Sequence, residues 1–140
     1  MKRIFTLLLM LVSLTAFSQK QHEKYYQNKV AERIHGKTEI VLDDKTRADI
    51  VTDTFAIEVD FAHKWAESIG QSLHYAYKLH KKAGIVLIVD GIKDDKYIQI
   101  LMPLADKYNI TVWVIFINDN SWGKVEAIIK NDTLPKKYIY

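Results

Sequence analysis

The chain of 140 residues contains no cysteine. This absence excludes a disulfide framework, thiol chemistry, cysteine-based zinc sites and a lipid anchor attached through cysteine. His63, His74 and His80 show no i, i+4 spacing, which argues against a histidine zinc site. The sequence also lacks a glycine-rich phosphate loop and a Gly-x-Ser-x-Gly elbow. We therefore expect a domain that is held together by packing alone.

Long apolar runs are absent except near the N-terminus. Lys2 and Arg3 precede an apolar segment at 4–12, and Ala16-Phe17-Ser18 follows as a small-x-small motif. This pattern predicts a secretory signal peptide over residues 1–18, with the mature chain beginning at Gln19. A membrane-spanning helix would need roughly 20 apolar residues, and polar side chains interrupt this run early. The sequence thus predicts export to the periplasm or the medium, with no membrane anchor after cleavage.

An excess of charge of one sign is also missing from the mature chain. The full sequence has 20 Lys+Arg and 17 Asp+Glu. The predicted signal peptide removes two cations and no acid, which leaves 18 against 17 and a net charge of +1. A general basic field for nucleic acid is therefore not indicated. The full sequence is 49% hydrophobic, and the length of residues 19–140 suffices for one domain with one core.

The clearest pattern lies at residues 55–61. Phe55, Ile57, Val59 and Phe61 alternate with residues 56, 58 and 60, so that one face of a strand is apolar and the other carries Glu58 and Asp60. These two acids have Cα atoms about 6.5 to 7 Å apart. Neighbouring carboxylates repel each other unless a cation, a basic side chain or water compensates them. A bound divalent metal ion is the sharpest explanation.

The other elements follow from periodicity and turn residues. An α/β protein with a mixed sheet is expected, with the order α-β-β-β-α-β-α-β. The first three strands form an antiparallel meander, and the later strands are parallel. The helices are predicted at 21–34, 62–82 and 95–108, and the strands at 38–43, 46–53, 55–61, 85–90 and 110–118. Asp94 is expected to cap the last helix, and Pro103 to kink it or to start a shorter one.

The helix predicted at 62–82 has two stripes. The stripe expected to face the core is Trp65, Ala66, Ile69, Leu73, Ala76 and Tyr77. A second stripe contains Lys64, Ser68, Gln71 and Tyr75 and would by itself be an ordinary solvated face. Likewise Asp49, two residues after Arg47, would by itself be one half of a surface ion pair.

Taken together, Asp49, Glu58 and Gln71-x-x-x-Tyr75 resemble the motifs of the PD-(D/E)XK nuclease superfamily. The Gln-x-x-x-Tyr element is similar to that of RecB-type exonucleases. The resemblance covers roughly residues 22–118 and implies a restriction-endonuclease-like core. It also implies that Asp49 and Glu58 bind Mg²⁺ or Mn²⁺, and that Gln71 and Tyr75 support the site or contact nucleic acid.

One position departs from the pattern of this superfamily. Asp60 stands two residues after Glu58, where the family usually has lysine. Lys64 lies on the next turn and is predicted to replace that lysine, with Asp60 as a supporting acid. Further acids that the resemblance brings into consideration are Glu23, Glu32 and Glu39.

The expected function is that of an exported, metal-dependent nuclease that hydrolyses phosphodiester bonds of nucleic acid. The alternative is a catalytically degenerate binding or interaction module with the same fold. A third possibility is a carboxylate-rich protein that binds a cation for structural reasons.

Overall fold

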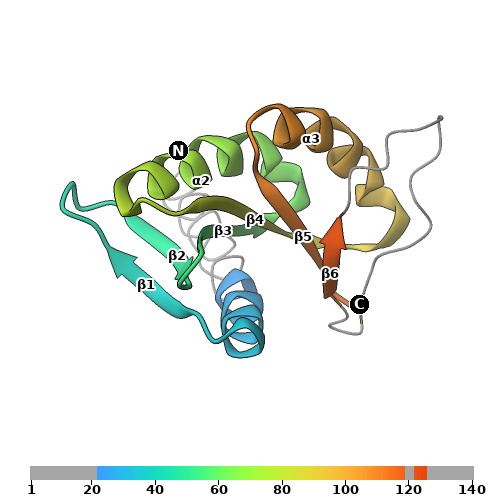
Figure 1. Ribbon diagram of the computed structural model, residues 1–140. Coiled ribbons are helices and arrows are strands. Elements are labelled where there is room, and N and C mark those ends of the chain that lie inside the picture. The colour runs from blue at the N-terminus through green and yellow to red at the C-terminus, as the bar shows by residue number, and fades with distance from the viewer. Residues whose placement is uncertain (1–21, 119–121, 126–140) are drawn as a thin grey trace, which may run out of the picture.

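The computed structural model describes residues 22–118 and 122–125. A helix over residues 22–34 precedes the sheet (blue in Figure 1). The remaining elements are β1 (Lys37–Val41), β2 (Arg47–Val51), β3 (Phe55–Phe61), the 3₁₀ turn η1 (Ala62–Lys64), α2 (Trp65–Leu79), β4 (Lys82–Val89), the 3₁₀ turn η2 (Gly91–Asp94), α3 (Asp95–Lys107), β5 (Thr111–Phe116) and β6 (Trp122–Val125). The predicted signal peptide and its cleavage position lie outside the described residues.

A single mixed sheet connects all the described strands in the order β1-β2-β3-β4-β5-β6. β1, β2 and β3 are antiparallel to one another, β3, β4 and β5 are parallel, and β6 is antiparallel to β5. The prediction of an α/β protein with a mixed sheet is therefore confirmed. β6 was not predicted, and it extends the sheet beyond β5.

Helices cover both faces of the sheet (Figure 1). α2 and α3 pack on one face, where Ala76 and Leu101 meet side chains of β4 and β5 such as Leu87. The helix over residues 22–34 packs on the opposite face, where Tyr26 and Val30 join a second buried cluster. No helix among the described residues has the length and apolar character needed to cross a membrane.

The strand β3 has the alternation that the sequence predicts. Ile57 and Val59 lie in the buried cluster under the N-terminal helix, while Ala56 packs with Tyr75 of α2 on the other side. β4 is buried on both faces, as its continuous apolar run indicates. Burial on both sides of β3 means that its acidic residues also lie inside the protein.

The ends predicted for the helix at 62–82 are wrong. The segment begins as the 3₁₀ turn η1, and α2 ends at Leu79 because His80 takes a left-handed conformation with φ 53°. The amide of Lys81 then donates to the carbonyl of Ala76 at 3.0 Å and closes the last turn. Lys82 N donates to Thr54 O at 2.9 Å, so β4 begins at Lys82 and not at residue 85.

The predicted core stripe of α2 is wrong in part. Ala66 and Tyr77 are exposed, whereas Ser68 and Ser72 are fully buried. Serine is small and allows the helix to lie close to the sheet. The two hydroxyls donate to carbonyl oxygens of their own helix segment, at 3.2 Å and 3.1 Å, so their burial leaves no unpaired donor. Packing against the sheet, rather than hydrophobicity, sets the buried face of α2.

Asp94 and Pro103 behave differently from the prediction. Asp94 stands at the N-cap position of α3, but its side chain makes no cap bond. Its Oδ2 instead accepts a hydrogen bond from the amide of Asp90 at 2.7 Å. α3 continues through Pro103 to Lys107, so this proline does not start a shorter helix.

Candidate functional site

The site begins where β2 and β3 separate. The paired residues between these strands are Ile50 with Ile57 and Val51 with Ala56. One residue further, Oδ2 of Asp49 accepts a hydrogen bond from the amide of Val59 at 2.9 Å. The carboxylate therefore takes the place of a backbone acceptor, which fixes it between the two diverging strands.

The backbone of β1 is distorted next to Asp49. Glu39 has a φ of 59°, a left-handed conformation that costs a residue with a side chain about 1 to 3 kcal/mol. Gln27 of the N-terminal helix is 4% exposed, and its Nε2 donates to the carbonyl of Asp49 at 2.7 Å and to Oε1 of Glu39 at 3.0 Å. The distorted strand is thus held in place from the helix beside it.

Glu58 occupies the most unusual environment. It is 6% exposed, and its Oε2 is buried with no hydrogen-bond partner among the described residues. Burial, together with the negative charges of Asp49 and Asp60, raises the pKa of Glu58 to about 9. Without a cation, this carboxyl group holds a proton at neutral pH.

The two neighbouring carboxyl groups are affected in the same direction. Burial raises the pKa of Asp49 to about 7, against the hydrogen bond from the amide of Val59. Burial also raises the pKa of Asp60 to about 6, although its hydrogen bond to Lys64 opposes the change. The fold therefore brings together carboxylates that positive charge would stabilise strongly.

Lys64 supplies part of that positive charge. Its Nζ lies 3.0 Å from Oδ1 of Asp60 and 3.3 Å from Oε2 of Glu23 on the N-terminal helix. Burial lowers the pKa of Lys64, but the bond to Asp60 and the charges of Asp60 and Glu23 outweigh it, so the pKa is raised. The ammonium group is therefore protonated and joins η1 to the N-terminal helix.

Gln71 and Tyr75 belong to the same region. The Tyr75 side chain is buried, and its interaction with the side chain of Gln71 opposes the rise of its pKa. Burial and the charge of Glu58 raise the pKa of Tyr75, so its hydroxyl stays protonated. Ser68 and Tyr75 are buried, so the second stripe of α2 is not a solvated face.

Three further acids were considered for the site. Glu23 contacts Lys64, and Glu39 accepts a hydrogen bond from Gln27, which also donates to the carbonyl of Asp49. Glu32 is exposed on the N-terminal helix. Nη1 of Arg47 pairs with Oε2 of Glu39 at 2.9 Å, while Asp49 turns to the amide of Val59. The reading of Asp49 as the surface partner of Arg47 is therefore wrong.

Gln27 is a site residue that the sequence analysis missed. It stands four residues after Glu23, so both side chains lie on one face of the N-terminal helix. A polar pair in line with apolar residues such as Val30 is the signal that would have indicated it. Its role depends on β1 and β2, which come later in the chain and which helical spacing does not reveal.

The residues present suit a hard divalent cation. Mg²⁺ prefers oxygen ligands and often uses only one or two carboxylates, with waters and substrate phosphates completing its shell. The unpartnered Oε2 of Glu58 beside Asp49 offers such oxygens. No group of three or more acidic or histidine side chains within the described residues has an arrangement that could itself hold a metal ion.

Comparison of the chain with protein-family models, with curated proteins and with solved structures found no match. The resemblance to PD-(D/E)XK nucleases therefore rests on the residues and the order of the elements. The chemistry of the site has to be inferred from its own geometry.

Proposed function

We propose that this chain is an exported, metal-dependent nuclease of the PD-(D/E)XK type with a restriction-endonuclease-like core. The observation that carries the proposal is the buried, unpartnered Oε2 of Glu58 beside Asp49. A buried polar group without a hydrogen-bond partner lowers the free energy of unfolding by about 1 to 3 kcal/mol. Oε2 of Glu58 has this cost in the protein without a ligand. Costs of this kind are typical of functional sites, where a bound ligand supplies the missing partner.

The arrangement of elements supports the same proposal. A helix, three antiparallel strands, a helix and a parallel strand follow one another. Asp49 on β2 and Glu58 on β3 stand at the point where those strands diverge, and Tyr75 approaches them from α2. Acids on neighbouring strands can share a bound cation.

Asp49 and Glu58 would hold Mg²⁺ or Mn²⁺ in this proposal. The bound ion would neutralise charge on the scissile phosphate and lower the pKa of water. Lys64 would orient the attacking water through its ammonium protons, while Asp60 keeps that ammonium in place. Gln71 and Tyr75 would support the acids or contact the nucleic acid.

A second candidate is a nuclease-like module that binds nucleic acid without cutting it. The contacts of Lys64 favour this alternative, because two carboxylates already use its ammonium group. An ammonium that is bound to both Asp60 and Glu23 has less capacity left for a water molecule.

Cleavage assays separate the candidates. The chain purified without residues 1–18 is incubated with plasmid and with single-stranded DNA and RNA, in Mg²⁺, in Mn²⁺ and in EDTA. We expect cleavage that needs the metal and that Glu58→Gln abolishes. The matched control is Glu32→Gln, the same change at an exposed acid, which should retain activity.

Other results would change the assignment. Binding that weakens with salt, without cleavage in any metal, would favour the binding module. Stabilisation by Mg²⁺ without binding or cleavage of nucleic acid would indicate a structural cation site.

Export is the remaining part of the proposal. Mass spectrometry of the protein recovered from culture should give a chain that begins at Gln19. A product that retains Met1 and stays in the cell would contradict it.

A further inference from the structure

A hollow of about 530 Å³ lies on the face of β3 that carries Phe55 and Ile57. It is bounded by the end of the N-terminal helix, the start of β1, the turn between β2 and β3, the residue before β4, and β5. Phe55 lines it, and Glu58 stands three residues along the same strand with its side chain on the opposite face. Ile57, the residue directly before Glu58, also lines the hollow, so it is the face of β3, and not distance along the strand, that separates the hollow from Glu58. The hollow is therefore distinct from the carboxylate cluster.

Aromatic rings form one part of its wall. Phe55 and Trp113 meet edge to face, with ring centroids 5.1 Å apart. The indole lies against Gly84 of β4, where an added Cβ would come within 2.9 Å of Cζ3 of Trp113. Glycine at this position is what allows the ring to lie so close to the strand. The indole is thus held in a defined place by its neighbours.

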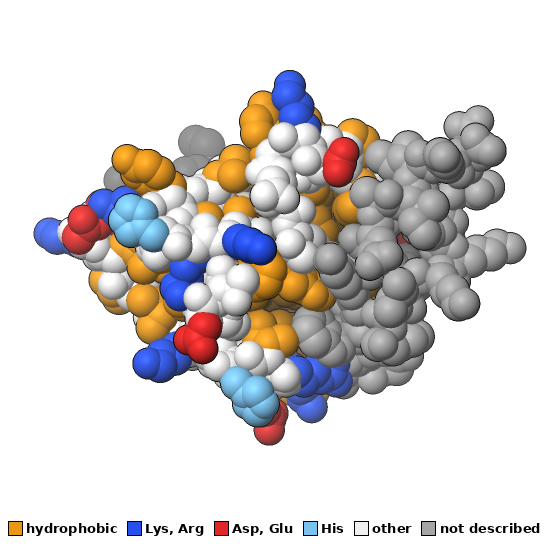
Figure 2. Space-filling view, in the orientation of Figure 1, with side chains coloured by type: hydrophobic (Ala, Val, Ile, Leu, Met, Phe, Trp, Pro, Cys, Tyr) orange, Lys and Arg blue, Asp and Glu red, His pale blue; other side chains and the backbone are white. Residues whose placement is uncertain are grey.

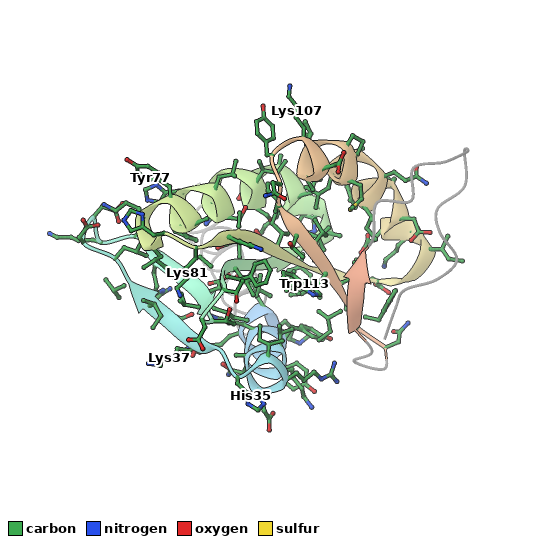
Figure 3. All side chains as sticks on the ribbon, in the orientation of Figure 1. His35, Lys37, Tyr77, Lys81, Lys107 and Trp113 are labelled. Atoms are coloured by element: carbon green, nitrogen blue, oxygen red, sulfur yellow. The ribbon has the colours of Figure 1, made fainter. Side chains whose placement is uncertain are left out.

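Two lysines stand at the edge of these rings. Lys37, Lys81 and His35 line the hollow, with Asp53 as the acid that lines it. Nζ of Lys81 donates to the carbonyl of Asp53 at 2.9 Å, which holds the lysine at the rim. Figure 3 shows His35, Lys37 and Lys81 around one side of Trp113, with Lys107 far away on α3.

The space-filling view agrees with this arrangement. Figure 2 shows hydrophobic side chains reaching the surface on this face between basic, histidine and some acidic side chains. An apolar aromatic wall with cations at its edge suits a ligand that has a flat ring and a phosphate. Aromatic side chains stack on any base and contribute about 1 to 3 kcal/mol per base, while lysines contact the backbone.

We propose that this hollow binds one nucleotide unit, with the base against Trp113 and the phosphate near Lys37 and Lys81. A base in a duplex is already paired and stacked, so the ligand is a free nucleotide or a nucleotide of a single strand. The size of the hollow falls within the range of small-ligand sites, about 300 to 1,000 Å³. The identification of the ligand as a nucleotide rests on the proposed function. A hollow that binds an unpaired nucleotide would give the nuclease a preference for single-stranded substrates.

The test is a binding measurement in EDTA, so that it does not depend on cleavage. Fluorescence anisotropy follows a labelled oligothymidylate of about 12 nucleotides at low salt. We expect Lys37→Glu to weaken binding by about tenfold and to reduce the salt dependence. Lys107→Glu is the matched control, because it makes the same charge change at an exposed lysine on α3. It should change the affinity by less than about twofold.

Three competitors define the ligand. An abasic oligonucleotide of the same length and a duplex should both bind more weakly than the oligothymidylate. Competition by thymidine monophosphate would show that a free nucleotide suffices, and its absence would show that the hollow requires a strand. Lys37 is exposed, so its variant should fold, and circular dichroism checks this.

Several results would overturn the inference. One is a lack of oligothymidylate binding at low salt. Another is an equal loss of affinity in Lys37→Glu and Lys107→Glu, and a third is equal affinity for the abasic oligonucleotide and the oligothymidylate. Cleavage in Mg²⁺ with binding unchanged in Lys37→Glu would refute the hollow and leave the nuclease proposal standing. Binding that depends on Lys37, with no cleavage in any metal, would refute the nuclease proposal and leave the hollow.

Discussion

Asp49 has two roles in the structure that substitutions can separate. One is to accept a hydrogen bond from the amide of Val59, and the other is to carry negative charge in the candidate site. Asparagine retains an oxygen acceptor and removes the charge, whereas alanine removes both. The two substitutions therefore distinguish structure from chemistry at one position.

Asp49→Ala is expected to lower the free energy of unfolding by about 1 to 3 kcal/mol, because the amide of Val59 loses its partner inside the protein. Asp49→Asn should be as stable as the parent in EDTA or more so, since it also relieves repulsion. Both variants should lose Mg²⁺-dependent cleavage. Urea denaturation and the cleavage assay measure the two effects, and an active Asp49→Asn would argue against a metal ligand at this position.

Lys64→Ala is expected to reduce turnover by about two orders of magnitude, as when a group that acts on the attacking water is lost. The affinity for Mg²⁺ should change little, because Asp49 and Glu58 remain. Asp60→Lys restores the pattern of the superfamily, and in combination with Lys64→Ala it should recover part of the activity.

Lys24→Ala, at an exposed lysine of the N-terminal helix, is the control for Lys64→Ala. Single-turnover cleavage and Mg²⁺ titration are the measurements. Normal turnover in Lys64→Ala would refute its role as the replacement lysine.

The boundaries of α2 depend on single backbone conformations at its ends. His80 closes the helix in a left-handed conformation that costs a residue with a side chain roughly 1 to 2 kcal/mol and glycine almost nothing. Asn109 takes the same conformation at the end of α3, as its sequence signal predicts, whereas at the end of the N-terminal helix the left-handed residue is His35 (φ 54°) and not the predicted Gly36. No such signal marks His80. The length of α2 was accordingly overestimated.

His80→Gly is expected to raise the free energy of unfolding by about 1 kcal/mol, because glycine adopts this conformation without strain. Tyr77→Gly is the control, since Tyr77 is 78% exposed inside the same helix. There glycine should lower the stability by about 1 kcal/mol. Thermal or urea denaturation of both variants measures the difference, and stabilisation or no change in Tyr77→Gly would contradict this account.

The stability of the whole protein should depend on pH through its buried acids. The folded state raises the pKa of Glu58 from 4.5 to about 9 and that of Asp49 from 3.8 to about 7. Between the unfolded and the folded values, the folded protein binds more protons than the unfolded chain. These groups therefore contribute stability at low pH that is lost as the pH rises from about 4 to 9.

The melting temperature in EDTA is thus expected to fall from pH 5 to pH 9, and less steeply in Glu58→Gln. Hydrogen bonds from Thr46 lower the pKa of Asp44 to about 2. The contribution of Asp44 to stability therefore changes with pH in the opposite direction, and only below pH 4. Mg²⁺ displaces protons from the acids, so its stabilising effect should be larger at pH 8 than at pH 6. A melting temperature in EDTA that rises with pH over this range would contradict the burial of these acids.

Local patterns in the sequence determine much of this fold. The alternation at residues 55–61 defines β3 because strand side chains point to opposite faces in turn. The same pattern places Glu58 and Asp60 on one face. The apolar run of β4 is equally local, so the α/β class and most strands were predictable.

Only the tertiary structure decides which residues meet. Gln27 bonds to Asp49 from 22 positions away, and Lys64 reaches Glu23 from 41 positions away. β6 pairs with the edge of β5, whose backbone groups would otherwise be unpaired, and this pairing joins two segments of the sheet. The buried face of α2 likewise depends on how closely the sheet approaches it. These features come from contacts between distant segments, and sequence periodicity describes only neighbours along the chain.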